Sequence, residues 1–323
     1  YNRNTNPELT KIKGLTAFSH VLTESNTTHK SVPMLMSSVT AHDFNSIYRQ
    51  KGIITAFKEA GYRTAFFSNQ RYNHSFIDFF GKEADICDFI KEDAGDGSYN
   101  PSDDELLKLV AAELAENASK QFIVLHTYGS HFNYRERYPA DHAFFLPDFP
   151  VDAELKYKDN LINAYDNSIR YTDNFLARLI RMLQEQDIDA AMLYTSDHGE
   201  DIFDDDRHLF LHASPVPSYY QIHVPFLIWM SDNYRKNYPD LFKNAEINRQ
   251  KNISSSASFF QTMLELGGID TPSRNDSLSV INASYTEKNR VYLNDHNEAR
   301  SLNDIGMREE DFTMLQTKGI VYR

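Results

Sequence analysis

The pattern of apolar and polar positions predicts buried strands that alternate with amphipathic helices. The expected strands are short, mostly continuous apolar runs at 14–22, 62–70, 121–131, 189–200, 224–230 and 290–295. The expected helices repeat apolar residues at helical spacing and span 31–39, 46–61, 102–118, 154–186 and 256–268. Continuous apolar strands separated by helices are typical of parallel sheets buried on both faces. We therefore expect an α/β fold, with a mostly parallel central sheet and helices on both faces.

Local signals indicate where several of these helices begin and end. Pro33 is expected in the first turn of its helix. Ser102 and Glu105 have the spacing of a capping box, and Gly61 is expected to end the helix before it. The chain has no internal repeat, low-complexity tract or linker. These features predict a single catalytic or binding domain over residues 1–323.

Composition narrows the class of protein. The 323 residues are 41% hydrophobic and 13% aromatic, so the chain can bury a large core. The formal net charge of −13 argues against a nucleic-acid backbone as the main partner. Cys87 is the only cysteine, which excludes an intrachain disulfide and a multi-cysteine zinc site. No apolar run approaches the ~18 to 20 residues that a membrane-spanning helix needs.

Residues that could bind phosphate or metal follow four of the expected strands. They are Thr27, Thr28 and His29, then Asn69 and Gln70, then Thr127, Ser130 and His131, and last Ser196, Asp197, His198 and Glu200. Ligands of open α/β sheets bind at the carboxyl ends of the strands. We therefore expect these residues to approach one site.

The stretch SNTTHKSVP, residues 25–33, has two interpretations. A threonine before a helix can cap its free backbone N–H groups. Alternatively, a threonine hydroxyl serves as a nucleophile where the helix dipole favours an incoming anion. The stretch by itself leaves both open.

The stretch SDHGE, residues 196–200, is the most informative. Asp197 and His198 could ligate one zinc ion, because zinc accepts oxygen and nitrogen donors. The alternative is an Asp–His pair in a turn at Gly199. Further histidines, among them His212, follow within a few residues. His131, on a loop after its strand, is a better ligand or phosphate contact than His126, which could equally be a core histidine.

Seven stretches together resemble phosphoethanolamine transferases of the alkaline phosphatase and sulfatase superfamily. They occur in the family's order between residue 3 and about residue 230: NTNPEL, TTHKSVPMLMS, HTYGSH, YDNSIRYTD, YTSDHGE, LFLHASP and HVPFLIW. These enzymes are membrane-anchored and decorate lipid A and other envelope glycans of bacteria. The resemblance implies an alkaline phosphatase or sulfatase-like fold.

The resemblance assigns a role to each matching position. The family's threonine nucleophile stands three residues before Ser-Val-Pro, which is Thr28 here. Asp197 and His198 match the zinc-binding pair, with Thr28 as a third ligand. His131 and His212 match residues that bind the substrate phosphate or a second zinc, and are candidates for catalysis. Asn69 and Gln70 fall near the family's phosphoethanolamine contacts.

The resemblance also implies a reaction. A threonine bound to zinc attacks phosphatidylethanolamine, releases diacylglycerol and passes phosphoethanolamine to an acceptor such as lipid A. A further zinc ligand, a glutamate, is expected on a strand upstream of Tyr1, after transmembrane helices. These would anchor the domain to the bacterial inner membrane, on its periplasmic side.

Some features depart from the family pattern. The chain lacks the disulfides of the lipid A enzymes, and LHASP replaces LHG-P. Two alternatives therefore remain: a phosphoglycerol transferase of the lipoteichoic-acid synthase type, and a metal-free, inactive binding domain. A sulfatase activity would need a C/S-x-P-x-R pattern, which the sequence does not contain.

Overall fold

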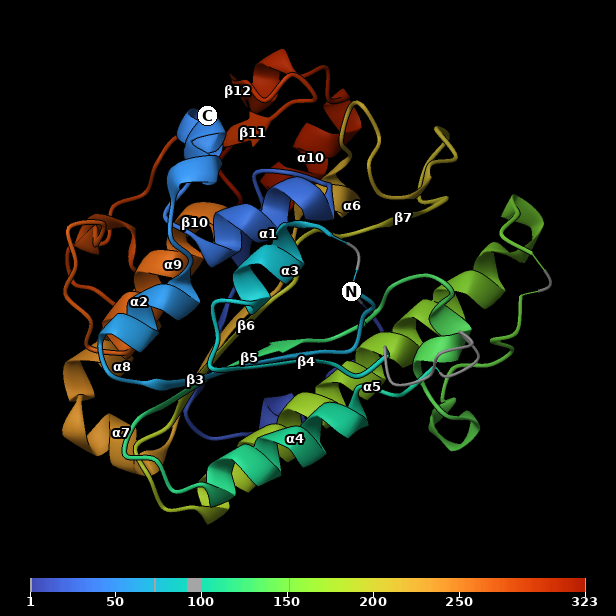
Figure 1. Ribbon diagram of the computed structural model, residues 1–323. Helices are drawn as coiled ribbons and strands as arrows, with labels where there is room; N and C mark the ends of the chain where they lie inside the picture. The colour runs from blue at the N-terminus through green and yellow to red at the C-terminus, as the bar shows by residue number, and fades with distance from the viewer. Residues whose placement is uncertain (1, 73, 92–99, 151, 323) are drawn as a thin grey trace.

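Two three-stranded sheets lie at the centre of the molecule, which is described by a computed structural model over residues 2–72, 74–91, 100–150 and 152–322 (Figure 1). The strands are β1 Leu15–Phe18, β2 His20–Leu22, β3 Arg63–Ser68, β4 Ile86–Phe89, β5 Gln121–His126, β6 Ala191–Thr195, β7 Asp201–Ile202, β8 Phe210–Leu211, β9 Phe226–Met230, β10 Asn252–Ser254, β11 Val291–Leu293 and β12 Ala299–Ser301.

Helices connect and cover these strands. The α-helices are α1 Thr28–Met36, α2 Ile53–Glu59, α3 Phe76–Gly81, α4 Asp104–Ala115, α5 Lys158–Glu185, α6 Tyr219–Ile222, α7 Asp232–Asn237, α8 Pro239–Asn248, α9 Ser255–Leu266 and α10 Glu309–Thr317. The 3-10 helices are η1 Leu9–Lys11, η2 Ala41–Arg49, η3 Tyr134–Arg137, η4 Ala140–His142, η5 Leu155–Tyr157, η6 Asp276–Leu278 and η7 Leu302–Asp304.

The first sheet has the order β4-β3-β5 and is parallel throughout. The second has the order β1-β9-β6, and β9 runs antiparallel to both of its neighbours. The short β2 and β10 form a further parallel pair. The predicted α/β class is confirmed, and β9 is the strand of the central layer that departs from parallel order.

Both faces of the first sheet are covered, because side chains alternate along each strand. Phe66 and Phe122 point into a core shared with α1, α2 and α9. Ala65 and Phe67 point to the opposite face, into a core formed with α4 and α5. The sheet is therefore sandwiched between two helical layers, as the continuous apolar runs predicted.

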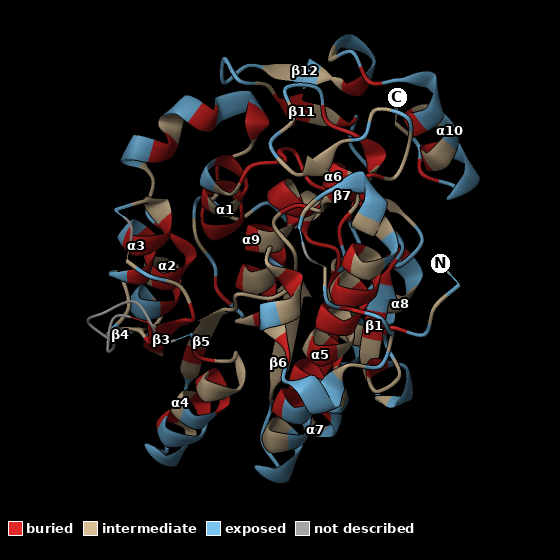
Figure 2. Cartoon of the chain, turned by 90° about the vertical axis from the view of Figure 1, so that its right-hand side faces the viewer, coloured by how far each residue is buried: buried red, intermediate tan, exposed pale blue. Residues whose placement is uncertain are grey.

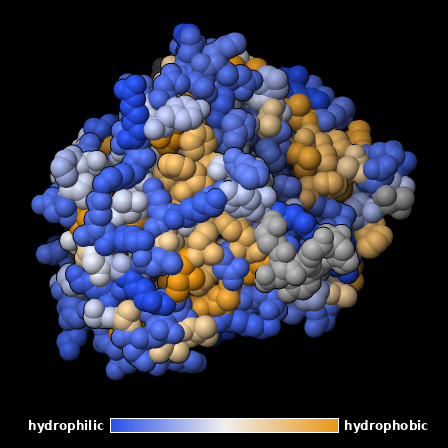
Figure 3. Space-filling model, in the orientation of Figure 1, coloured by the Kyte–Doolittle hydropathy of each residue, from blue (hydrophilic) through white to orange (hydrophobic). Residues whose placement is uncertain are grey.

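The edge strands β5 and β6 of the two sheets line a common cavity of about 1420 Å³. Within the described residues, β5 pairs only with β3 and β6 only with β9, so each keeps one unpaired edge. The cavity is lined along the length of both strands and reaches Thr28, Asp197 and His198 at one end. Figure 2 shows β5 and β6 in the colour of partial burial, although they occupy the middle of the fold. Figure 3, drawn in the orientation of Figure 1, shows apolar residues at the surface near the centre of the molecule.

Three predicted boundaries were wrong. The expected strand 14–22 is two strands with different partners, because the Ser19 N–H donates to the Arg249 carbonyl and interrupts the ladder. The first helix begins at Thr28, so Pro33 lies inside it rather than in its first turn. The capping box at Ser102 does not form, since Asp103 is the N-cap residue and Glu105 pairs with Lys108.

Two other helices were predicted too long. The region 46–61 divides into η2 and α2, although Gly61 follows the end of α2 with a φ of 83°, as expected for a helix stop. The region 154–186 begins as η5 and becomes α5 only at Lys158. No helix in the described part of the chain is long and apolar enough to cross a membrane.

Candidate active site

The N-terminus of α1 presents Thr28. Thr27 is extended, with φ −132° and ψ 131°, and its carbonyl accepts the N–H groups of Lys30 and Ser31. Thr27 is thus the N-cap residue by position, but its hydroxyl pairs with Ser25 and caps no N–H group. The backbone therefore turns into the helix at Thr28, where the dipole favours a negatively charged ligand.

Thr28 lies close to the residues that follow the end of β6. Its hydroxyl lies 3.1 Å from Nε2 of His198, and the same Nε2 lies 3.4 Å from Oδ2 of Asp197. Ser31, one turn along α1, donates a hydrogen bond of 3.2 Å to that carboxylate. The structure thus gathers the three residues predicted to bind zinc at the end of the cavity between β5 and β6.

The tautomer of His198 follows from its second contact. Nδ1 lies 3.0 Å from the carbonyl oxygen of Gly199, and a carbonyl can only accept. A neutral His198 that donates its Nδ1 proton to this carbonyl presents the Nε2 lone pair to the Thr28 hydroxyl. This is the state in which a histidine accepts a proton or binds a metal.

His212 lies next to His198, with their ring centroids 4.0 Å apart. Its Nδ1 is 3.2 Å from the Glu200 carboxylate, whose other oxygen accepts a hydrogen bond from Tyr134. Glu200 was expected near the site but was given no role, and Tyr134 was not predicted as a site residue. Glu200 could have been recognised because it belongs to SDHGE, whereas nothing near Tyr134 in the sequence points to it.

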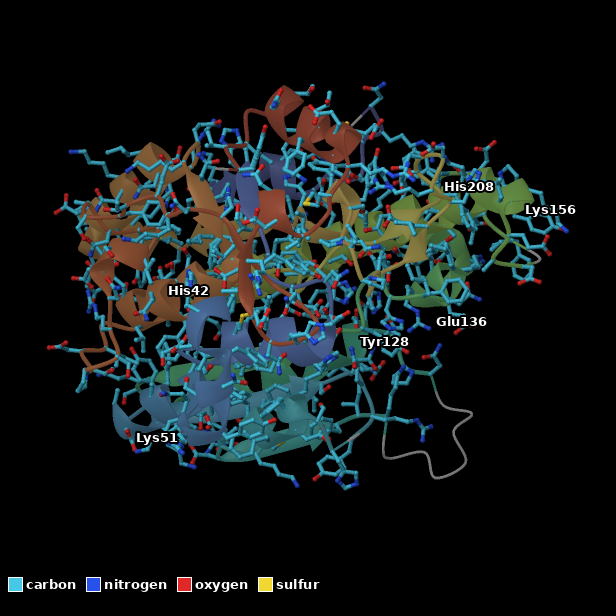
Figure 4. The ribbon with its side chains drawn as sticks, turned by 90° about the horizontal axis from the view of Figure 1, so that it is seen from above. His42, Lys51, Tyr128, Glu136, Lys156 and His208 are labelled. Atoms are coloured by element: carbon cyan, nitrogen blue, oxygen red, sulfur yellow. The ribbon has the colours of Figure 1, made fainter. Side chains whose placement is uncertain are left out.

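His131 stands at the outer rim of the same group. Its ring centroid lies 6.3 Å from that of His212 and 5.1 Å from that of Tyr128. The His131 side chain is exposed, and its Nδ1 contacts the Phe132 carbonyl at 2.6 Å. Figure 4 shows Tyr128 just beyond the end of β5, with Glu136 farther out on the same side. His131 is therefore accessible to a ligand that approaches from solvent.

Asn69 and Gln70 are placed differently. Asn69 is buried, and its amide donates to the Pro101 carbonyl and to Asp103 at 3.0 and 2.7 Å. Gln70 lines the large cavity. No hydrogen bond between described residues joins either side chain to Thr28, Asp197 or His198. Their predicted role as phosphoethanolamine contacts stays a prediction.

The environment favours a charged Asp197. Burial raises the pKa of Asp197, but His198, Thr28, His126 and Ser31 together outweigh it and hold this pKa below its usual value. Loss of hydration lowers the pKa of His126, whose Nδ1 contacts the Ser68 hydroxyl at 2.9 Å. The Asp197 carboxylate and the imidazole of His198 are oxygen and nitrogen donors of the kind that a divalent cation such as zinc accepts.

The donors present suit zinc but are incomplete. Asp197 offers oxygen, His198 nitrogen and Thr28 a hydroxyl, all of which zinc accepts. Among the described residues, no three His, Cys, Asp or Glu side chains gather into a metal-binding group. A tetrahedral ion held here would need a fourth ligand.

Comparison with known proteins identifies the family of the chain. A family model described as sulfatase matches residues 1–269. The chain belongs to the sulfatase family. Among curated family relatives, it is 25% identical over 301 residues to phosphoethanolamine transferase EptC of Escherichia coli strain K12, covering 90% of this chain and 51% of EptC. It is 31% identical over 266 residues to the Kdo(2)-lipid A phosphoethanolamine 7''-transferase of the same strain, covering 78% and 45%.

These relatives confirm the resemblance to phosphoethanolamine transferases. The chain spans about half the length of the curated relatives it matches. A crystal structure of the C-terminal periplasmic domain of EptC from Escherichia coli, in complex with Zn, superimposes with a TM-score of 0.84 at 23% identity, covering 95% of this chain and 88% of that one. This likeness shows the fold, and confirms its alkaline phosphatase or sulfatase-like type.

Proposed function

We propose that this chain is the catalytic domain of a zinc-dependent phosphoethanolamine transferase. The donor is phosphatidylethanolamine, and the acceptor is lipid A or another envelope glycan. The observation that carries the proposal is the Thr28 hydroxyl at a helix N-terminus, 3.1 Å from Nε2 of His198. The names of the relatives support phosphoethanolamine as the transferred group.

In the first step, Thr28 releases its hydroxyl proton to solvent and its oxygen forms a bond to the donor phosphorus. The bond from phosphorus to the diacylglycerol oxygen breaks, and that oxygen takes a proton from protonated His131 or His212. In the second step, an acceptor hydroxyl attacks the phosphorus and gives its proton back to that histidine, while the bond from phosphorus to the Thr28 oxygen breaks and Thr28 takes up a proton from solvent. The amide dipoles at the start of α1 stabilise the charge that collects on phosphorus.

Thr28, Asp197 and His198 would hold the zinc ion. When bound, zinc lowers the pKa of a ligating hydroxyl and offsets negative charge on the phosphoryl oxygens. The Zn complex of the EptC periplasmic domain supports the choice of metal. We place the domain on the periplasmic side of the bacterial inner membrane. The EptC domain, which is described as periplasmic, supports this location.

We also propose that an extended segment N-terminal to Tyr1 occupies the cavity between β5 and β6. Both strands offer unpaired backbone there, and a strand added between them would satisfy these groups. Thr5 and Asn6 line the cavity, so the N-terminal part of the chain already runs beside it. Such a strand would end near Thr28, where the glutamate implied by the family resemblance can complete the ligand set.

The test is the covalent intermediate. The chain is incubated with zinc and vesicles that contain phosphatidylethanolamine and phosphatidylglycerol, and its intact mass is measured. We expect an adduct of the mass of phosphoethanolamine on Thr28. Thr28→Ala should lose the adduct and slow transfer about 10³-fold or more, whereas Thr27→Ala, which removes a hydroxyl paired only with Ser25, should keep both.

Other outcomes identify the alternatives. A phosphoglycerol adduct on Thr28 would show a transferase of the lipoteichoic-acid synthase type. No adduct and no transfer, also by a chain extended through the upstream segment, would show an inactive binding domain. Circular dichroism of both threonine variants checks that they fold.

A further inference from the structure

Three large apolar side chains stand out from one loop between η4 and η5. Phe144, Leu146 and Phe149 are 61, 66 and 73% exposed, and together we call them the loop patch. Side chains of this size are usually buried, and neighbouring exposed ones mark interaction surfaces. Single exposed apolar residues are common on protein surfaces, but three in one loop indicate a surface that binds a partner.

The loop beneath the patch is held in place by buried polar groups. Asn167 of α5 accepts the N–H groups of Phe144 and Phe145 at 3.0 and 2.9 Å, and donates to the Phe145 carbonyl. Asn163 donates to the Pro147 carbonyl at 2.8 Å. With the backbone fixed to α5 in this way, the apolar side chains cannot fold back into the core.

Acidic and basic side chains around the patch determine what can cover it. The guanidinium of Arg170 lies 4.1 Å from the centre of the Phe144 ring, and that of Arg3 lies 4.9 Å from the Phe145 ring. Aromatic rings with arginine beside them suit the boundary of a lipid bilayer, where rings enter the headgroup region and guanidinium groups reach phosphates. Asp141 and Asp152 flank the loop, so the surface is not strongly basic.

The loop patch also shares its end of the molecule with the candidate site. Tyr165 of α5 is two residues from Asn167, and its ring packs 5.0 Å from that of Tyr134, which donates to Glu200 beside His212. In Figure 1 the green loops project beyond the sheets at the N-terminal end of α5. Figure 4 places Lys156 at this outer end, and His42 and Lys51 on the opposite side.

We propose that the loop patch docks on the surface of a phospholipid bilayer, with its rings and Leu146 in the headgroup region. The choice of a bilayer as occupant rests on the proposed function, because a lipid donor must reach the site from a membrane. Since the surface carries acids as well as bases, apolar insertion drives the docking. Binding therefore persists at high salt and does not require anionic lipid.

The test uses tryptophan fluorescence of the 323-residue chain with phosphatidylethanolamine and phosphatidylcholine vesicles that carry brominated acyl chains. In Phe149→Trp, we expect a blue shift and quenching when vesicles are added. The control is Tyr48→Trp, because Tyr48 is 80% exposed and belongs to η2, whose His42 lies on the opposite side in Figure 4. The native Trp229 is fully buried and gives a constant background.

A second measurement removes the apolar groups. Phe144→Ser, Leu146→Ser and Phe149→Ser combined should weaken vesicle binding about tenfold or more, since burying one such side chain already contributes about this factor. Tyr48→Ser should leave binding unchanged. Equal responses of the two tryptophans, no response of either, or binding that disappears at high salt would overturn the proposal.

Sedimentation velocity tests self-association, the competing occupant. A dimer that the triple variant abolishes would assign the loop patch to a second copy of the chain and refute bilayer docking. The result is independent of catalysis. Vesicle binding without a Thr28 adduct, also in the N-terminally extended chain, would refute the proposed function alone. An adduct from a short-chain, water-soluble donor without vesicle binding would refute docking alone.

Discussion

At the scale of single residues, two histidines are oriented in the same way. His198 and His212 each use Nδ1 for a contact with an oxygen, of Gly199 and of Glu200. Each therefore leaves Nε2 available on the side of the site. Sequence motifs predicted these residues and Thr28 through their resemblance to a known family. They could not give the ring orientations, which depend on contacts made only after folding.

We expect His131→Ala and His212→Ala each to lower the transfer rate by about 10²-fold or more, because each removes a positioned proton donor or phosphate contact. His74→Ala is the control, since His74 packs against Tyr72 with its ring 4.7 Å away and joins none of the site contacts described. Steady-state transfer from phosphatidylethanolamine measures the rates. Similar small effects of all three changes would mean that the site lies elsewhere.

At the scale of elements, β7 and α6 are joined through one carboxylate. The hydroxyl of Ser218, the N-cap residue of α6, lies 2.9 Å from both carboxylate oxygens of Asp201 in β7, and the Gln221 amide donates to the same carboxylate. Burial raises the pKa of Asp201, and the hydrogen bonds from Ser218 and Gln221 lower it. Burial has the larger effect, so this pKa is raised to about 6. Asp204 adds to the rise and Arg207 opposes it. The junction is thus most stable with a protonated aspartic acid.

This shift makes the stability of the junction depend on pH. Between the unfolded pKa of 3.8 and about 6, the folded chain binds more protons than the unfolded chain, so stability falls as pH rises. The full loss is about 3 kcal/mol. Urea unfolding should show Asp201→Asn gaining about this much relative to the wild type between pH 4 and pH 7. A difference that does not change with pH would contradict the prediction.

Elements were predicted well where a local pattern decides them. The apolar runs located β3, β5, β6 and β9. The division of 14–22 was missed, because Ser19 turns away to a partner 230 residues later in the sequence. Pairing of this kind is decided by tertiary packing, which a window of neighbouring residues does not contain.

At the scale of the whole molecule, the cavity between β5 and β6 leads from the middle of the fold to the proposed zinc site. Its lining is apolar along both strands and becomes polar at Thr28 and Asp197. Apolar runs predicted that these strands are buried but could not show which edges stay unpaired. The antiparallel direction of β9 was equally beyond the sequence, because both directions bury the same side chains.

We expect the 323-residue chain to bind zinc at least tenfold more weakly than a chain extended N-terminally through the proposed strand, because the short chain offers three donors and less negative charge. Isothermal calorimetry of the two chains at equal pH measures this directly. Tight binding of one zinc ion per molecule by the short chain would show that the ligand set is different or that the upstream glutamate is dispensable.

The unpaired edges of β5 and β6 also bear on the order in which the chain folds. The strand proposed between them would be synthesised before both, and its second neighbour, β6, ends only at Thr195. The middle of the sheet would then close only after β6 is made, through contacts distant in sequence, which form slowly. Until then the proposed strand would lack its second partner, and the nascent protein would most depend on protection from aggregation.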